Sequence, residues 1–165
     1  MGKFFGNLFL MAFVALIAIG IFSEPDRDEQ GEIVDEGNLS AFALRLGDCF
    51  NDPKEKVNPD TGIAEVEQVR AIPCANPHHN EVFALFNIQL DAFPGTEQVS
   101  SIASENCLSH FNEYVGKDYK ESALDFYSLL PTQQSWNDRG DKEVICVVHK
   151  MSGEKTAGSL KNSGL

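Results

Sequence analysis

The chain has 165 residues and carries 25 acidic but only 13 basic side chains, which gives a formal net charge of −12. A surface of this sign repels phosphate groups, because phosphate binding needs clustered lysine and arginine side chains. Nucleic acid is therefore excluded as a partner.

The first recognisable element is an apolar run from Phe4 to Phe22, in which Asn7 is the one strongly polar residue. At about 1.5 Å of rise per residue, a helix of this length crosses the hydrocarbon core of a bilayer. Lys3 precedes the run and acidic residues follow it, so we expect residues 1–3 to be cytoplasmic and the rest of the chain to be extracytoplasmic. The prediction is a single-pass protein of the cell membrane, with the lipid bilayer as partner of residues 4–22.

A cleaved secretory signal is the alternative reading of the same run. Ala18-Ile19-Gly20 approximates a small-x-small cleavage site, and the positive region before the run is short. The run continues through Phe22, beyond that site, which favours an uncleaved anchor.

Residues 23–38 form an acidic segment, in which seven acidic residues between Glu24 and Glu36 accompany one base, Arg27. Such a segment repels itself, and we expect an extended, solvated linker that holds the domain away from the membrane. Residues 39–151 then suffice for one folded domain. The segment 152–165 is rich in Gly, Ser and Lys, and we expect a loose tail.

Alternating apolar residues predict the first strands of this domain. Phe42, Leu44 and Leu46 alternate with smaller or charged residues, which predicts a half-buried strand that ends near Phe50. Residues 51–62 contain turn residues and form a loop. Residues 65–72 and 81–88 predict two further strands, of which the second is apolar on both faces and should be central and covered.

One long helix follows. Pro94-Gly95-Thr96-Glu97 is typical of a helix start, with Thr96 as the expected cap, and apolar residues recur at helical spacing until Gly116. Residues 124–130 and 143–150 predict two more strands, joined by a turn-rich connection over 131–142. The expected fold is α+β, a small, mostly antiparallel sheet with one long helix packed on it.

Four cysteines, Cys49, Cys74, Cys107 and Cys146, follow the apolar run. They are widely spaced, form no Cys-x-x-Cys motif and are predicted to lie outside the cytoplasm, so two structural disulfides are expected. Three connectivities are open. Cys49 with Cys74 and Cys107 with Cys146 is preferred, because each pair joins elements that should be neighbours.

The densest polar cluster lies between the second and third predicted strands, over residues 73–81. His78, His79 and Glu81 could bind a metal or supply an acid and a base if Asp48 or His149 folded nearby. Adjacent residues of an extended segment point to opposite faces, so His78 and His79 cannot easily share one ion. We therefore expect a rigid loop, no metal and no cofactor.

Trp136 is the only tryptophan and lies in the turn-rich connection, followed by Arg139 and Asp141. Its indole is either an exposed recognition anchor or a lid on the core, and burial is commoner for aromatic side chains. The candidate contact loops are accordingly Pro77 to Glu81, with His78, and Trp136 to Asp141, with Arg139.

An ordered set of motifs between Leu46 and Lys161 resembles the septum formation domain family of actinobacteria. The motifs are Gly47-Asp48-Cys49, Cys74-x-x-Pro77-His78-x-x-Glu81-Val82-Phe83, Cys107 followed by Tyr114-Val115-Gly116, Pro131 with Gln134-Ser135-Trp136, Gly140-Asp141 before Cys146, and Gly158-Ser159-Leu160-Lys161. The resemblance implies an anchored or secreted envelope protein with a link to cell division, and it names no catalytic residue. Lys142 stands where the family pattern has arginine, so a bidentate role there is in doubt.

These observations predict a membrane-anchored, extracytoplasmic interaction module of the cell envelope, linked to septum formation and without catalysis. Its partner would be an envelope or division protein. The alternative is a small envelope hydrolase or metal-dependent enzyme that uses His78, Glu81 and Asp48.

Overall fold

The computed structural model describes residues 24–53, 56–57 and 64–165. The predicted membrane span, residues 4–22, lies outside this part of the chain. Within the described residues, no helix has both the length and the apolar character needed to cross a membrane.

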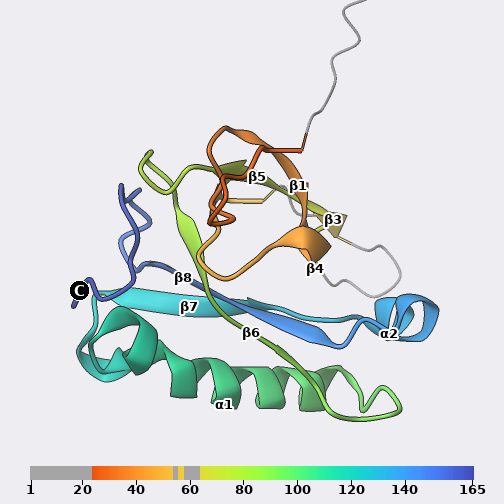
Figure 1. Cartoon of the computed structure of the whole chain (residues 1–165). Coiled ribbons are helices and arrows are strands. Elements are labelled where there is room, and N and C mark those ends of the chain that lie inside the picture. Colours follow the sequence, from red (N-terminus) through yellow and green to blue (C-terminus); the bar gives the residue numbers. More distant parts are fainter. Residues whose placement is uncertain (1–23, 54–55, 58–63) are drawn as a thin grey trace, which may run out of the picture.

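A six-stranded antiparallel sheet forms the centre of the fold, with strand order β1-β5-β2-β6-β8-β7 (Figure 1). Its strands are β1 (Gly37–Ser40), β2 (Cys49–Asn51), β5 (Gln68–Ile72), β6 (Asn80–Asn87), β7 (Leu124–Leu129) and β8 (Glu143–Lys150), and a separate short pair is formed by β3 (Lys56–Val57) and β4 (Ala64–Glu65). The helical elements are α1 (Thr96–Val115), α2 (Gln133–Arg139) and the short 3-10 turns η1 (Ala41–Ala43) and η2 (Tyr119–Glu121). The expected α+β architecture, with an antiparallel sheet and one long helix, is confirmed.

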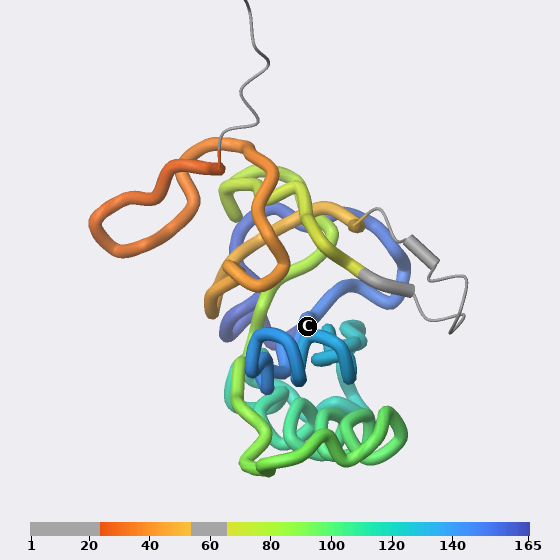
Figure 2. Tube along the Cα trace, turned by 90° about the vertical axis from the view of Figure 1, so that its right-hand side faces the viewer, coloured from red at the N-terminus to blue at the C-terminus, as the bar shows by residue number. Residues whose placement is uncertain are grey.

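Apolar residues cover both faces of the central strand β6. Phe83 and Ala84 pack with α1 residues such as Phe111, whereas Val82 packs on the opposite face with Phe50. A bulge between Val82 and Ala84 turns two consecutive side chains toward α1, which strict alternation would not allow. Figure 2 shows the resulting layers, with α1 at one end of the molecule and the N-terminal segments at the other.

Helix α1 ends where the sequence predicts but begins differently. Gly116 adopts the left-handed conformation (φ 81°), and its N–H bonds the Asn112 carbonyl. The N-cap is Gly95, and no side chain caps the first turn, so the expectation that Thr96 caps the helix is wrong.

Two disulfides join the elements, Cys49 with Cys74 and Cys107 with Cys146. This is the connectivity preferred from the sequence. The second bond ties the buried face of α1 to β8, while the first ties the start of β2 to the turn after β5.

Residues 42–46 do not form the predicted strand. Ala41–Ala43 is a 3-10 turn, and Phe42 and Leu46 are exposed, with only Leu44 of the three alternating residues buried. The apolar alternation misled the prediction because Leu44 alone faces the core.

The acidic segment also differs from the predicted extended linker. Arg27 and Ile33 face each other in a β-bridge, and Ile33 is buried in the core cluster beneath β1 and β5. The segment from Arg27 onward is therefore part of the folded domain.

The predicted loose tail is likewise an ordered strap. His78 and Thr156 form a β-bridge, Asn162 N–H bonds the Tyr114 carbonyl, and Leu160 is fully buried against the α1 side of the core. The composition suggested a loose segment, but the buried side chain of Leu160 and several backbone hydrogen bonds fix it to the domain.

Replacing Leu160 by alanine should lower the free energy of unfolding by about 3 kcal/mol, because it leaves a cavity beneath the strap. The matched control is Leu165→Ala, since that side chain is exposed and its loss should cost less than about 0.5 kcal/mol. Urea unfolding of both variants measures the difference, and equal midpoints would contradict the role assigned to Leu160.

Candidate functional site

Glu81 occupies the centre of a buried polar network at the start of β6. Its side chain is fully buried and accepts three hydrogen bonds, from the Tyr114 hydroxyl (2.6 Å), the Ser159 hydroxyl (2.5 Å) and the Leu160 N–H (2.6 Å). The donors come from α1 and from the C-terminal strap. Because a buried carboxylate requires donors, this one residue joins the sheet, the long helix and the strap.

Tyr114 is perturbed by the same contact. Burial, together with the hydrogen bond to Glu81, raises the pKa of the Tyr114 phenol above its ordinary value. The phenol is therefore held as a hydrogen-bond donor and is not available as a base.

This shift predicts the alkaline behaviour of the fold. The unfolded chain releases the phenol proton near pH 10, whereas the folded chain retains it, so the stabilisation is complete below about pH 10 and is lost as the pH rises further. The melting temperature should fall more steeply above pH 10 in the unsubstituted chain than in Tyr114→Phe. Parallel curves for the two proteins would contradict the assignment.

His78 is also fully buried, on the turn that leads into β6. Its Nδ1 lies 2.8 Å from the Asn76 carbonyl oxygen, which can only accept, so Nδ1 carries a proton. Nε2 is buried and has no hydrogen-bond partner among the described residues. Potential ligand atoms of Cys49, His78 and Glu81 lie within 4.8 Å of one another, but the Cys49 sulfur is bonded to Cys74.

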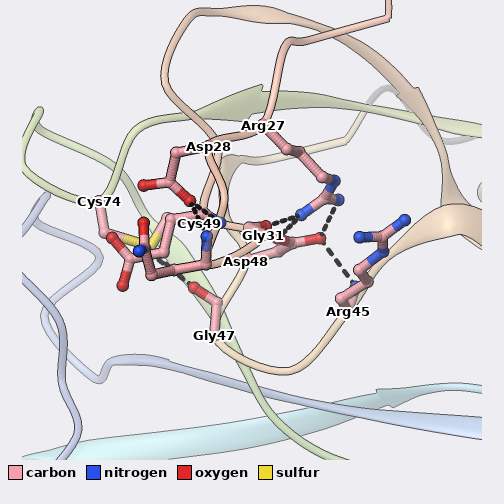
Figure 3. Close-up of polar contacts among 10 residues, drawn as sticks. Arg27, Asp28, Gly31, Arg45, Gly47, Asp48, Cys49 and Cys74 are labelled. Atoms are coloured by element: carbon pink, nitrogen blue, oxygen red, sulfur yellow. Dashed lines mark hydrogen bonds and ion pairs between the residues drawn. A yellow bond between two sulfur atoms is a disulfide. The ribbon is translucent and has the colours of Figure 1, made fainter.

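Asp48 forms a second buried site, shown in Figure 3. Its Oδ1 and Oδ2 accept from Arg27 Nη1 (2.6 Å) and Nη2 (2.7 Å), and Oδ2 also accepts the Arg45 N–H at 2.7 Å. Arg27 Nη1 also donates to the Gly31 carbonyl at 2.8 Å, which fixes the turn of the acidic segment. The hydrogen bond to Asp48 raises the pKa of Arg27, so the guanidinium is charged at every physiological pH.

The structure therefore does not assemble the acid–base set of the enzymatic alternative. His78 and Glu81 do lie together, but both are fully buried, and the carboxylate of Asp48 is bound to Arg27. Each of these residues is engaged in contacts within the protein.

The second predicted contact loop is in fact helix α2. Thr132 and Ser135 form a reciprocal capping box, and Trp136 is buried against Phe93, with its indole N–H 3.4 Å from the Asp91 carbonyl. The indole is thus a lid on the core. Asp141 accepts the Glu143 N–H at 3.2 Å.

Of the six candidate contact residues named from the sequence, only Pro77 and Arg139 are exposed. The Arg139 guanidinium lies 5.1 Å from the ring centre of Phe42, which is itself 50% exposed, and Leu46 is 57% exposed. Sequence reasoning missed these two apolar side chains because their alternating pattern indicated burial. The exposed, contacting pair Phe42 and Arg139 is named the η1 patch.

Comparison with known proteins gives one match. Residues 46–164 match a family model described as Septum formation. No curated protein and no solved structure matches the chain.

Proposed function

Because the chain belongs to the septum formation family, we propose that it acts in septum formation as a single-pass, membrane-anchored interaction module whose folded domain lies outside the cytoplasm. The family match carries this proposal, since it covers every strand of the sheet except β1, together with α1 and the C-terminal strap up to residue 164. It links the chain to cell division. The cell membrane as location, and an envelope or division protein as partner, are part of the proposal.

The position of Arg27 supports a domain held close to the membrane. The apolar run ends at Phe22, five residues before Arg27, which is bound to Asp48. Five residues span at most about 18 Å, so an anchored chain would hold this end of the domain near the lipid surface. This arrangement replaces the long spacer expected from the acidic composition.

The η1 patch is the contact surface that we propose for the partner. Exposed aromatic and arginine side chains are common anchors of protein interfaces, and the stacking of Arg139 on Phe42 lowers the entropy lost when either is ordered.

The contacts of the two buried carboxylates, Glu81 and Asp48, support a module without catalysis. Glu81 is fully buried and accepts three hydrogen bonds from within the protein, and Asp48 is bound to arginine, so neither carboxylate is exposed to act on a substrate. The two disulfides suit an oxidising compartment outside the cytoplasm.

Photocrosslinking in cells tests the proposed function. A photoreactive residue is placed at Phe42 of the full chain, and the matched control carries it at Leu108, an exposed apolar residue on α1. We expect division or wall-synthesis proteins to be enriched from position 42 and not from position 108.

Identical crosslinking profiles from the two positions would overturn the η1 patch as a contact surface. Turnover of a peptidoglycan or peptide substrate by the purified chain would overturn the proposal of a non-catalytic module. Membrane fractionation of the full chain tests the anchor separately.

A further inference from the structure

The cluster of Cys49, His78 and Glu81 is chemically unlike the rest of the core. A thiolate, an imidazole and a carboxylate are the ligand types that bind zinc, and their candidate atoms already lie within 4.8 Å of one another. In a tetrahedral site with bonds of about 2.0 to 2.3 Å, ligand atoms lie somewhat closer than this, so the three candidate atoms must draw together, while the Cys49 and Cys74 sulfurs must move apart once their bond is broken.

His78 is prepared for this role by its hydrogen bond. Because Nδ1 is engaged with the Asn76 carbonyl, Nε2 is the ring atom left to bind a cation, and this buried atom has no partner among the residues described. Donation from the other ring nitrogen to a backbone carbonyl is the usual arrangement for a metal-binding histidine. An unpaired buried acceptor costs free energy, which a bound cation would recover.

The Cys49–Cys74 disulfide is also the more accessible of the two. Cys74 is partly exposed, whereas Cys107 and Cys146 are both fully buried. A thiolate of a dithiol reductant can attack the Cys74 sulfur and release Cys49, and its second thiol then displaces Cys74. The reductant becomes a disulfide, and its two protons pass to the two cysteines.

We propose that the chain with a reduced Cys49–Cys74 bond holds one zinc ion through Cys49, Cys74, His78 and Glu81. The two thiol protons are released as the metal binds. Cys74 lies beside the cluster because its sulfur is bonded to that of Cys49 in the oxidised chain. Glu81 has a free acceptor position on Oε2, since that atom receives a single hydrogen bond, from Leu160 N–H.

Zinc uptake by the full chain in detergent tests this site. A phosphine reduces the disulfide, taking its oxygen from water and leaving two thiols, and it competes weakly for metal. We expect one zinc per reduced chain and none in the oxidised chain, with alkylation confined to Cys49 and Cys74. Cobalt in place of zinc should give a sulfur-to-metal charge-transfer band.

His78→Ala should lower the zinc affinity of the reduced chain at least about tenfold, while His110→Ala, at an exposed position on α1, should leave it unchanged. Glu81→Gln provides a second variant, and circular dichroism of the oxidised forms verifies folding. Equal affinity in His78→Ala and the unsubstituted chain would overturn the site. So would a reduced chain that stays folded without zinc uptake, or that unfolds and does not refold when zinc is added.

Discussion

Replacing Arg27 by alanine should lower the free energy of unfolding by about 3 kcal/mol and release the acidic segment from the domain. The substitution removes the two hydrogen bonds that the guanidinium donates to Asp48 and the one that it donates to the Gly31 carbonyl, and it leaves the carboxylate of Asp48, only 4% exposed, without its counter-charge. Breaking a buried pair by removing one partner is strongly destabilising, because the remaining charge stays desolvated. Urea unfolding measures the loss, and proteolysis within residues 24–36 measures the release.

Arg70→Ala is the matched control for this prediction. Arg70 pairs with Glu36 at 3.2 Å, but the two side chains are 52% and 48% exposed, so the pair should contribute less than about 1 kcal/mol. The loss of unfolding free energy in Arg27→Lys should lie between those of Arg27→Ala and Arg70→Ala, since an ammonium keeps the charge but cannot form the bidentate contact. Similar losses of unfolding free energy in Arg27→Ala and Arg70→Ala would show that the buried ion pair between Arg27 and Asp48 contributes no more to stability than an exposed one.

The sequence predicted best those elements whose pattern is long and periodic. Strand β6 is apolar on both faces and proved central, and α1 repeats apolar residues at helical spacing up to Gly116. Helix α2 was missed because its seven residues, Gln133–Arg139, are too few to show a helical period. Its signal was the pair Thr132 and Ser135, which form the capping box.

Long-range contacts explain the other differences. Nothing in the local composition of the acidic segment indicates that Arg27 meets Asp48, 21 residues away, or that Ile33 enters the core. The C-terminal strap is another such case, because the Leu160 N–H donates a hydrogen bond to Glu81, 79 residues away in the sequence. In both segments, a few residues with long-range contacts hold the chain in place although the surrounding residues are polar.

The structure brings together only part of the predicted polar cluster. His78 and Glu81 do come together, as their spacing allowed, yet burial turns them into internal contacts. Asp48 joins a different network through Arg27, and only the fold decides which partner a carboxylate meets.

Glu81→Ala should be the most destabilising substitution in the strap region. It leaves the Tyr114 hydroxyl, the Ser159 hydroxyl and the Leu160 N–H without an acceptor. Two of these donors, the Tyr114 hydroxyl and the Leu160 N–H, are buried, whereas Ser159 is exposed and can turn to water. Each buried donor left unpaired costs about 1 to 3 kcal/mol, so we expect a loss of about 2 to 6 kcal/mol in the free energy of unfolding. The strap should also detach first, which hydrogen exchange of the Leu160 and Asn162 amides would detect.

Tyr114→Phe separates the carboxylate from one of its donors. This variant removes a single hydroxyl and leaves Glu81 bonded to the strap, so it should cost about 1.5 to 3 kcal/mol and leave the Leu160 amide protected. In the double variant Glu81→Ala/Tyr114→Phe, the loss of unfolding free energy should be smaller than the sum of the two single losses, because Glu81 and Tyr114 share one hydrogen bond. The control is Glu154→Ala, an exposed carboxylate in the same strap, which should stay within about 0.5 kcal/mol of the unsubstituted chain. Additive losses, or a strap that exchanges equally fast in Glu154→Ala and Glu81→Ala, would mean that Glu81 does not hold the C-terminal segment in place.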